Sequence, residues 1–261
     1  MPVVISGAST PTNVATVAWQ TRSVTVTSSS AVAGYPAINL TDPATWSSWK
    51  PSSVGGWAAY EFTGATQINT VGIASHNMGS SGASFDIQGS SDGSSWATQV
   101  SYSPLTDEDI LLLFPTTTFR HWRIRMNGNT ANVGVLVLTL RVSFPHTPID
   151  SYTPLHHARK YDKMFNDSIK GAMLGNRVMA SGAETEVDFG FVPRVFVDTS
   201  LLAFESHYNQ GGMFFYASWP AGLPQDIGYC RTNTEDGTIQ IEFIEGENLA
   251  SLSFGIHAYA G

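Results

Sequence analysis

The chain has 261 residues, enough for one large domain or two ordinary ones, and 42% of them are hydrophobic, which suffices for a buried core. Only 13% are charged, and the formal net charge is −8. Residues 195–261 carry one Arg against eight Asp or Glu, so we expect duplex nucleic acid to be repelled. The single cysteine, Cys230, excludes an intramolecular disulfide, and we expect it to be a buried apolar side chain.

The beginning of the sequence has neither the basic segment nor the long apolar segment of a signal peptide. The longest apolar run, Val133–Leu140, is too short to span a bilayer. We therefore expect a protein that is made in the cytoplasm, does not insert into membranes, and leaves the cell only by lysis or inside a particle.

Short runs of β-branched and aromatic residues, separated by Gly, Ser, Asn, Asp and Pro, fill the first 145 residues and favour a β-sandwich or jelly roll. At 122–126, Trp122, Ile124 and Met126 share one face of a strand, and the intervening arginines share the other. The predicted strands are Val14–Trp19, Val24–Ser28, Ala58–Phe62, Thr70–Ser75, Ser84–Ser90, Ile110–Phe114, His121–Met126 and Val133–Ser143.

Three prolines within Pro145–Pro154 end this first unit, because proline cannot donate to a sheet ladder. We predict a linker over 146–175, in which the basic stretch His156–Lys170 has room for a short helix, and a second β-rich domain over 176–261. A turn at 235–237 joins two strands of that domain as a hairpin. Its predicted strands are Val187–Phe191, Arg194–Thr199, Met213–Ser218, Tyr229–Asn233, Thr238–Ile244 and Ser251–Tyr259.

Five segments of the first half follow one another in a recognisable order. They are Tyr35–Trp49, Trp57–Phe62, Ile68–Ala74, Phe85–Trp96, which reads F-D-I-Q-G-S-S-D-G-S-S-W, and Phe119–Arg125, which reads F-R-H-W-R-I-R. In order and spacing they resemble the discoidin, or coagulation-factor type C, family of galactose-binding-like proteins. The resemblance implies an all-β fold, with a discoidin-like jelly-roll β-sandwich over 1–145 followed by a second β-sandwich domain. The disulfide of secreted members is missing here.

Flat aromatic faces can stack on sugar rings, so Trp46, Trp49 and Trp57 are candidates for a carbohydrate platform. We expect Trp46 and Trp57 to pack in the core, although either could serve the platform, and Trp49 is the candidate that we place in a loop. His76 and Asn77 follow a predicted strand and are candidate ligand-binding residues. The alternative for these two is a solvated loop.

Acidic residues suggest at most a calcium site. The resemblance implies a cation in the first loop, where Asp42 is a weak calcium candidate, and Asp107-Glu108-Asp109 could also bind calcium, with a solvated turn as the alternative. We predict no other metal and no cofactor. Glu205-Ser206-His207 are sequence neighbours that would point to opposite faces of a strand, so we predict that the protein is not an enzyme.

The whole chain resembles a tail-tip or baseplate structural protein of a tailed bacteriophage. This resemblance implies a location in the virion tail, self-association into a homo-oligomeric ring, and docking of other tail proteins, with contact to a host-surface glycan. The alternative is a carbohydrate-binding module for host or substrate recognition. We expect basic and acidic edges to meet between subunits. The residues expected there are Arg159, Lys160, Lys163, Glu242, Glu245 and Glu247.

Overall fold

The chain folds into two compact units, which are described separately. A computed structural model describes residues 3–5, 13–20, 23–148, 152–234, 237–244 and 248–259. The first unit comprises residues within 1–147 and 214–227, and the second comprises residues within 148–213 and 228–260. The second half of the sequence is therefore not one continuous domain. Glu235 and Asp236 of the expected hairpin turn lie outside the described residues.

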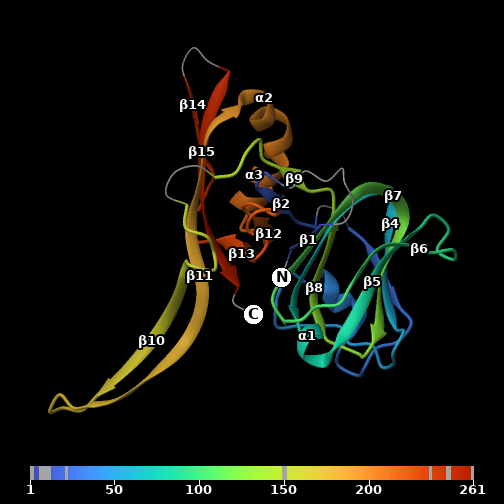
Figure 1. Cartoon of the computed structure of the whole chain (residues 1–261), viewed down its shortest axis with the longest axis horizontal. Helices are drawn as coiled ribbons and strands as arrows, with labels where there is room; N and C mark the ends of the chain where they lie inside the picture. The colour runs from blue at the N-terminus through green and yellow to red at the C-terminus, as the bar shows by residue number, and fades with distance from the viewer. Residues whose placement is uncertain are drawn as a thin grey trace. The chain divides into compact units, whose positions relative to one another are not determined.

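The first unit is built almost entirely of strands (Figure 1). Its elements are β1 (Val3–Ile5), β2 (Thr16–Ala18), β3 (Thr25–Ser28), η1 (Ala37–Thr41), β4 (Trp57–His76), α1 (Met78–Ser81), β5 (Ala83–Ser90), β6 (Ala97–Tyr102), β7 (Ile110–Gly128), β8 (Val133–Thr139), β9 (Val142–Ser143) and β12 (Phe214–Ala217). The prediction of an all-β first half is confirmed. Two pairs of predicted strands form single long strands. Strand β4 includes the predicted strands Ala58–Phe62 and Thr70–Ser75, and β7 includes Ile110–Phe114 and His121–Met126.

Two long strands, β4 and β7, pair along their whole length and pass through both layers of a sandwich. Tyr60 lies opposite Trp122 in one layer, and Val71 lies opposite Leu112 in the other, with register shifts between them. Strands β3, β5 and β6 complete the first layer, and β8 and β1 complete the second. Side chains from both layers belong to one buried apolar cluster, so the layers face each other.

The sandwich core contains a buried tyrosine that joins three elements. The hydroxyl of Tyr60 lies 2.9 Å from the carbonyl oxygen of Leu40 in η1 and 3.0 Å from that of Leu136 in β8. Burial raises the pKa of Tyr60, so the hydroxyl stays protonated and can donate. A single buried polar group thereby fixes the position of η1, the element that precedes the first loop.

Strands β2, β9 and β12 form a small antiparallel ladder in the first unit. Phe215 of β12 lies opposite Ala18 of β2 and packs on Gly72 of β4. A Cβ atom at Gly72 would lie 2.3 Å from the Phe215 ring, so only glycine fits there. This contact explains why 214–227 belongs to the first unit, although the sequence placed it in the second domain.

The second unit is a sheet with helices on one face (Figure 1). Phe204 and Tyr208 of a short helix pack on the inner face of the sheet, with ring centroids 5.8 and 5.5 Å from that of Phe254. Its elements are β10 (Arg159–Asp167), β11 (Met173–Pro193), α2 (Arg194–Phe196), the π-helical η2 (Val197–Leu201), α3 (Leu202–Asn209), β13 (Ile227–Thr232), β14 (Gln240–Phe243) and β15 (Leu249–Tyr259). None of the described helices is long and apolar enough to cross a membrane.

Two secondary-structure predictions were wrong in this unit. The predicted strand Arg194–Thr199 is helical, because Pro193 starts a helix and the buried residues Val197, Leu201 and Phe204 recur at helical spacing. The β-branched residues of that segment favoured a strand locally, and packing overrode this preference. The possible helix within 156–170 is instead β10, which pairs with β11 along its length.

Beyond the end of β15, β10 and β11 continue as a two-stranded ribbon, comprising residues 159–182 (Figure 1). Tyr259, at the end of β15, lies opposite Gly182. All residues of β10 are exposed, as are residues 173–179 of β11. The ribbon therefore has no core of its own.

Candidate functional site

The loop that follows η1 carries the most exposed aromatic side chain of the described residues. Trp46 is 86% exposed. The loop around it is ordered by Asp42, whose Oδ1 accepts a hydrogen bond from the Ala44 amide at 2.9 Å and whose Oδ2 lies 3.4 Å from the Ser47 hydroxyl. The indole is thus a flat apolar surface on a loop with fixed backbone contacts.

A strained residue holds this loop against the sandwich. Ser75, near the end of β4, has a φ of 53°, which is unusual for a residue with a side chain. Its hydroxyl donates to the carbonyl oxygen of Thr45 at 2.6 Å. A Cβ atom at Gly134 would lie 2.8 Å from Ser75 Cβ and 3.1 Å from the Ser47 carbonyl oxygen. Gly134 and Ser75 therefore position the Trp46 loop, and such strain is concentrated at functional sites.

His76 and Asn77 brace the neighbouring loops. His76 is only 6% exposed, and its Nε2 lies 2.8 Å from the Glu108 carbonyl oxygen while its Nδ1 accepts from the Met78 amide at 3.3 Å. Burial lowers the pKa of His76, so the ring is neutral at neutral pH, with its proton on Nε2. Asn77 Oδ1 accepts from the Asn132 amide at 2.7 Å. Their ligand-binding role stays a prediction, and the role that the structure shows is to tie loops together.

The expected positions of the tryptophans in the first loop are reversed. Trp49, our candidate for the sugar platform, is fully buried in the core, and its Nε1 donates to the Ser30 carbonyl oxygen at 3.2 Å. Its backbone also pairs with Val133. The structure therefore gives Trp49 no surface for a ligand. Trp46, which we expected in the core, takes the exposed position.

Trp57 lies on the outer face of the sandwich and not in its core. Along β4, Ala58, Tyr60 and Phe62 face inward, so the alternation of a strand turns Trp57 outward. The guanidinium of Arg123 contacts two indoles, at 4.1 Å from the ring centroid of Trp96 and 5.7 Å from that of Trp57. Arg123 Nε also donates to Gln88 Oε1 at 2.7 Å. These contacts order both half-buried tryptophans and leave less indole surface for a ligand than Trp46 has.

Two of the acidic calcium candidates, Asp42 and Asp107, are engaged in turns. Both carboxylate oxygens of Asp42 bond within its own loop, and Asp107 Oδ1 accepts from the Ser80 amide at 2.9 Å. Hydrogen bonds from Ser80 lower the pKa of Asp107, although its partial burial opposes them. No group of three or more His, Cys, Asp or Glu that could hold a metal ion occurs within the part of the chain that the structure describes.

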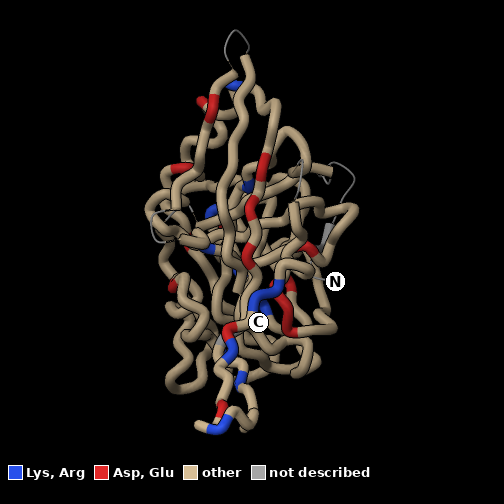
Figure 2. The backbone as a smooth tube through the Cα atoms, turned by 90° about the vertical axis from the view of Figure 1, so that its left-hand side faces the viewer, with Lys and Arg blue, Asp and Glu red and all other residues tan. Residues whose placement is uncertain are grey.

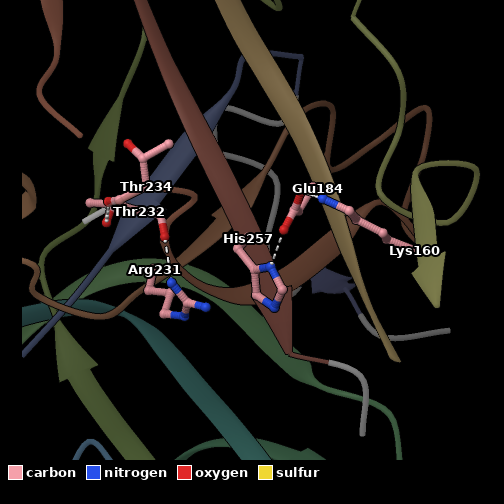
Figure 3. A network of polar contacts seen from close by, with 6 residues as sticks. All are labelled: Lys160, Glu184, Arg231, Thr232, Thr234 and His257. Carbon is pink, nitrogen blue, oxygen red and sulfur yellow. Dashed lines mark hydrogen bonds and ion pairs between the residues drawn. The ribbon is translucent and has the colours of Figure 1, made fainter. Parts of the chain in front are cut away.

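Near the base of the ribbon, one carboxylate joins β10, β11 and β15 (Figure 3). Glu184 of β11 pairs with Lys160 of β10 through Oε2, and its Oε1 lies 2.9 Å from His257 Nδ1 of β15. Lys160 and then His257 hold the pKa of Glu184 below its ordinary value. Beside them, Arg231 donates to the Thr232 carbonyl oxygen at 3.0 Å (Figure 3).

The residues expected at a subunit interface lie on two elements. Arg159, Lys160 and Lys163 are exposed on β10, and Glu242 is exposed on β14. Glu245 and Glu247 lie outside the described residues. Lys160 already pairs with Glu184 of its own chain, so it contributes less to a partner than we expected.

Comparison with known proteins shows likenesses to solved structures that cover about the first half of the chain. No protein-family model and no curated protein matches the chain. A pectin-binding carbohydrate-binding module is 19% identical, covering 46% of this chain and 93% of that one, with a TM-score of 0.41. The family 32 module of AlyQ, in complex with 4,5-unsaturated mannuronic acid, is 25% identical over 45% and 95% of the two chains, with a TM-score of 0.40.

A family 32 module from C. perfringens NanJ, in complex with galactose, is 12% identical over 44% of this chain and 92% of that one, with a TM-score of 0.40. These modules have the discoidin-like, galactose-binding-like β-sandwich that the sequence of the first half resembles. The first half of this chain is itself a two-layered, mostly antiparallel β-sandwich.

Proposed function

We propose that the sandwich of the first unit binds a carbohydrate and that the Trp46 indole is the surface on which a sugar ring stacks. The observation that carries this proposal is the 86% exposure of Trp46 on a loop that Ser75 and Gly134 hold in place. A sugar ring has an apolar C–H face and a polar rim. The exposed indole of Trp46 offers a flat apolar surface to the C–H face.

The expected contribution of the indole is large enough to measure. Covering about 80 Å² of its surface contributes roughly 2 kcal/mol at about 25 cal/mol per Å². This corresponds to about 30-fold in affinity. The fixed loop adds to it, because little conformational freedom is lost on binding.

Among the similar solved modules, one binds pectin, and two are in complex with 4,5-unsaturated mannuronic acid and with galactose. This agrees with the proposal, but at TM-scores of about 0.4 it adds no weight to it. The proposal rests on the loop geometry.

A glycan array tests the proposal directly. The wild-type chain should bind a restricted set of glycans, and Trp46→Ala should lose this binding while it keeps its circular dichroism spectrum. Trp219→Ala is the matched control, because Trp219 is a second exposed tryptophan of the first unit. Equal binding by wild type and Trp46→Ala, or no glycan bound by the wild type, would refute the proposal.

We also propose that the chain is a structural subunit that associates with copies of itself, as a tail-tip or baseplate component of a bacteriophage would. The exposed ribbon, which has no core of its own, supports self-association. Sedimentation velocity over a range of concentrations tests this part, and a strictly monomeric chain would contradict it. Immunogold labelling of purified particles tests the virion location, and unlabelled tails would contradict that.

A further inference from the structure

The ribbon exposes large apolar side chains on both strands. Among the described residues, this is the largest run of such side chains along two paired strands. Tyr161, Lys163 and Phe165 lie on the same face of β10, so a basic side chain stands between two aromatic ones on that face. The exposed apolar residues are Tyr161, Met164, Phe165, Ile169, Met173, Leu174, Val178 and Met179.

An isolated two-stranded ribbon is marginally stable in water. The two outer edges of the ribbon carry backbone groups with no neighbouring strand, because β15 ends at Tyr259, opposite Gly182 of β11. Contiguous exposed apolar surface of this kind marks an interaction site. The ribbon therefore has the properties of an arm that another surface covers.

The charge of the ribbon selects the kind of partner. Its cations are Arg159, Lys160, Lys163, Lys170 and Arg177, and its acids are Asp162 and Asp167 (Figure 2). Pairing two ribbons side by side would bring like charges together, which disfavours that arrangement. The residues after the ribbon, 183–261, have the opposite character, with eleven Asp or Glu against two Arg.

The acidic charge of the second unit is concentrated on the outer face of its sheet. Val187 and Phe189 of β11 face the helices, so Glu186 and Asp188 face outward. Asp188 lies opposite Ser253 of β15, and Glu242 of β14 lies opposite Ser251. Ser251 and Ser253 are two residues apart on β15, so they share a face, and Glu242 is therefore on the same face as Asp188. Within the described part of the chain, none of these three carboxylates has an ion pair.

A polar depression of about 250 Å³ lies on this sheet, where β13 and β14 diverge beside β15. Glu186 is the only charged residue of its lining, which also includes Asn233, Gln240 and Ser253 and, from the inner face, Tyr208 and Phe254. Gly255 leaves room for the Asn233 amide, because a Cβ atom there would lie 2.2 Å from it. The depression can receive a Lys or Arg side chain beside a carboxylate.

We propose that the ribbon of one copy of this chain lies on the acidic outer face of β11, β15 and β14 of a second copy. Arg159 and Lys163, which share a face of β10 with Tyr161 and Phe165, are the cations that the acidic face receives, because Lys160 is held by Glu184 of its own chain. This inference rests on the proposed self-association and names its surfaces. The contact is heterologous, so it generates a ring if the rotation closes and a filament otherwise.

Charge reversal on each surface tests the proposal on the full chain, by sedimentation velocity and light scattering. Arg159→Glu with Lys163→Glu, or Glu186→Lys with Asp188→Lys, should each weaken association by about 30-fold, which equals about 2 kcal/mol. An equimolar mixture of these two variants should associate again, because each variant then meets a complementary surface. A chain with all four substitutions should also associate.

The controls reverse charge elsewhere: Lys50→Glu in the first unit and Glu205→Lys on α3 should leave association unchanged. Circular dichroism of each variant excludes unfolding as the cause, and restoration in the mixture excludes it independently. Added salt should weaken association of the wild type and of the mixture alike.

Different failures have different meanings. If the wild type associates and charge reversal on the ribbon changes nothing, self-association stands and the ribbon contact is refuted. If the wild type is monomeric at every concentration, both proposals fail. Binding of the ribbon to phosphatidylserine vesicles by a monomeric chain would assign the ribbon to a membrane surface and would also overturn the inference.

Discussion

Gly134→Ala tests whether the Trp46 loop is positioned by close packing. The new methyl group would lie 2.8 Å from Ser75 Cβ, 2.9 Å from the Ser75 carbonyl oxygen and 3.1 Å from the Ser47 carbonyl oxygen. Backbone atoms make up two of these contacts, so they cannot move aside as a flexible side chain would. The loop or the end of β4 must shift.

Overpacking of this kind costs about 1–3 kcal/mol. In urea, a loss of about 2 kcal/mol moves the unfolding midpoint of the sandwich by roughly 1 M, given an m-value of about 1–3 kcal/mol per M. Tryptophan fluorescence reports this transition, because Trp49 and Trp122 are fully buried. Glycan affinity should fall as well, since the substitution displaces the loop that carries Trp46.

Gly64→Ala is the matched control, because a Cβ atom at Gly64 has no atom within 4 Å. Its free energy of unfolding should stay within about 0.5 kcal/mol of that of the wild type. If Gly134→Ala unfolds at the same urea concentration as Gly64→Ala and keeps full glycan binding, the packing argument for the loop is refuted.

Three further substitutions have expected outcomes. Trp49→Ala should destabilise the sandwich by about 3–5 kcal/mol, whereas Trp46→Ala should change the urea midpoint little; equal effects would contradict their assigned burial. Tyr60→Phe should cost about 1–3 kcal/mol, because a buried carbonyl oxygen loses its donor; an unchanged midpoint would contradict the shared hydrogen bond. Lys160 and His257 hold the pKa of Glu184 below its ordinary value, so its stabilisation is present above that ordinary pKa and is lost as pH falls through the lowered pKa. The difference in melting temperature between wild type and Glu184→Gln should therefore shrink on acidification, and a constant difference would refute it.

The alternation of side chains along strands predicted much of the sandwich. The expected division of Trp122, Ile124 and Met126 from their neighbouring arginines is confirmed, since all three are fully buried. Gly93, which follows Asp92, has a φ of 72°, a backbone conformation that glycine adopts readily. These features depend on local sequence and on the period of a strand.

Burial of the loop tryptophans could not be predicted in the same way. Trp46 and Trp49 lie three residues apart in irregular backbone, where no period assigns a face. The contacts that fix them come from Ser75 and Gly134, which are distant in sequence. Trp57 differs, because the alternation of β4 already places it opposite to Tyr60, so its outward position was predictable from the sequence.

The ribbon was missed for a physical reason. Its apolar residues alternate imperfectly, because register shifts occur after Asp162 and after Asn166. Strand formation there depends on pairing with β11, and this pairing cannot be deduced from β10 alone. The basic charge of the segment was visible in the sequence, and its role as an exposed arm came only from the structure.

Titration calorimetry with the best glycan from the array tests the central claim most directly. Wild type, Trp46→Phe and Trp46→Ala should bind in decreasing order, because a phenyl ring offers part of the stacking surface and a methyl group offers almost none. Trp46→Ala should lose about 30-fold or more in affinity. Equal affinities across the three proteins, at equal fold stability, would contradict the claim that the Trp46 loop is the carbohydrate-binding surface.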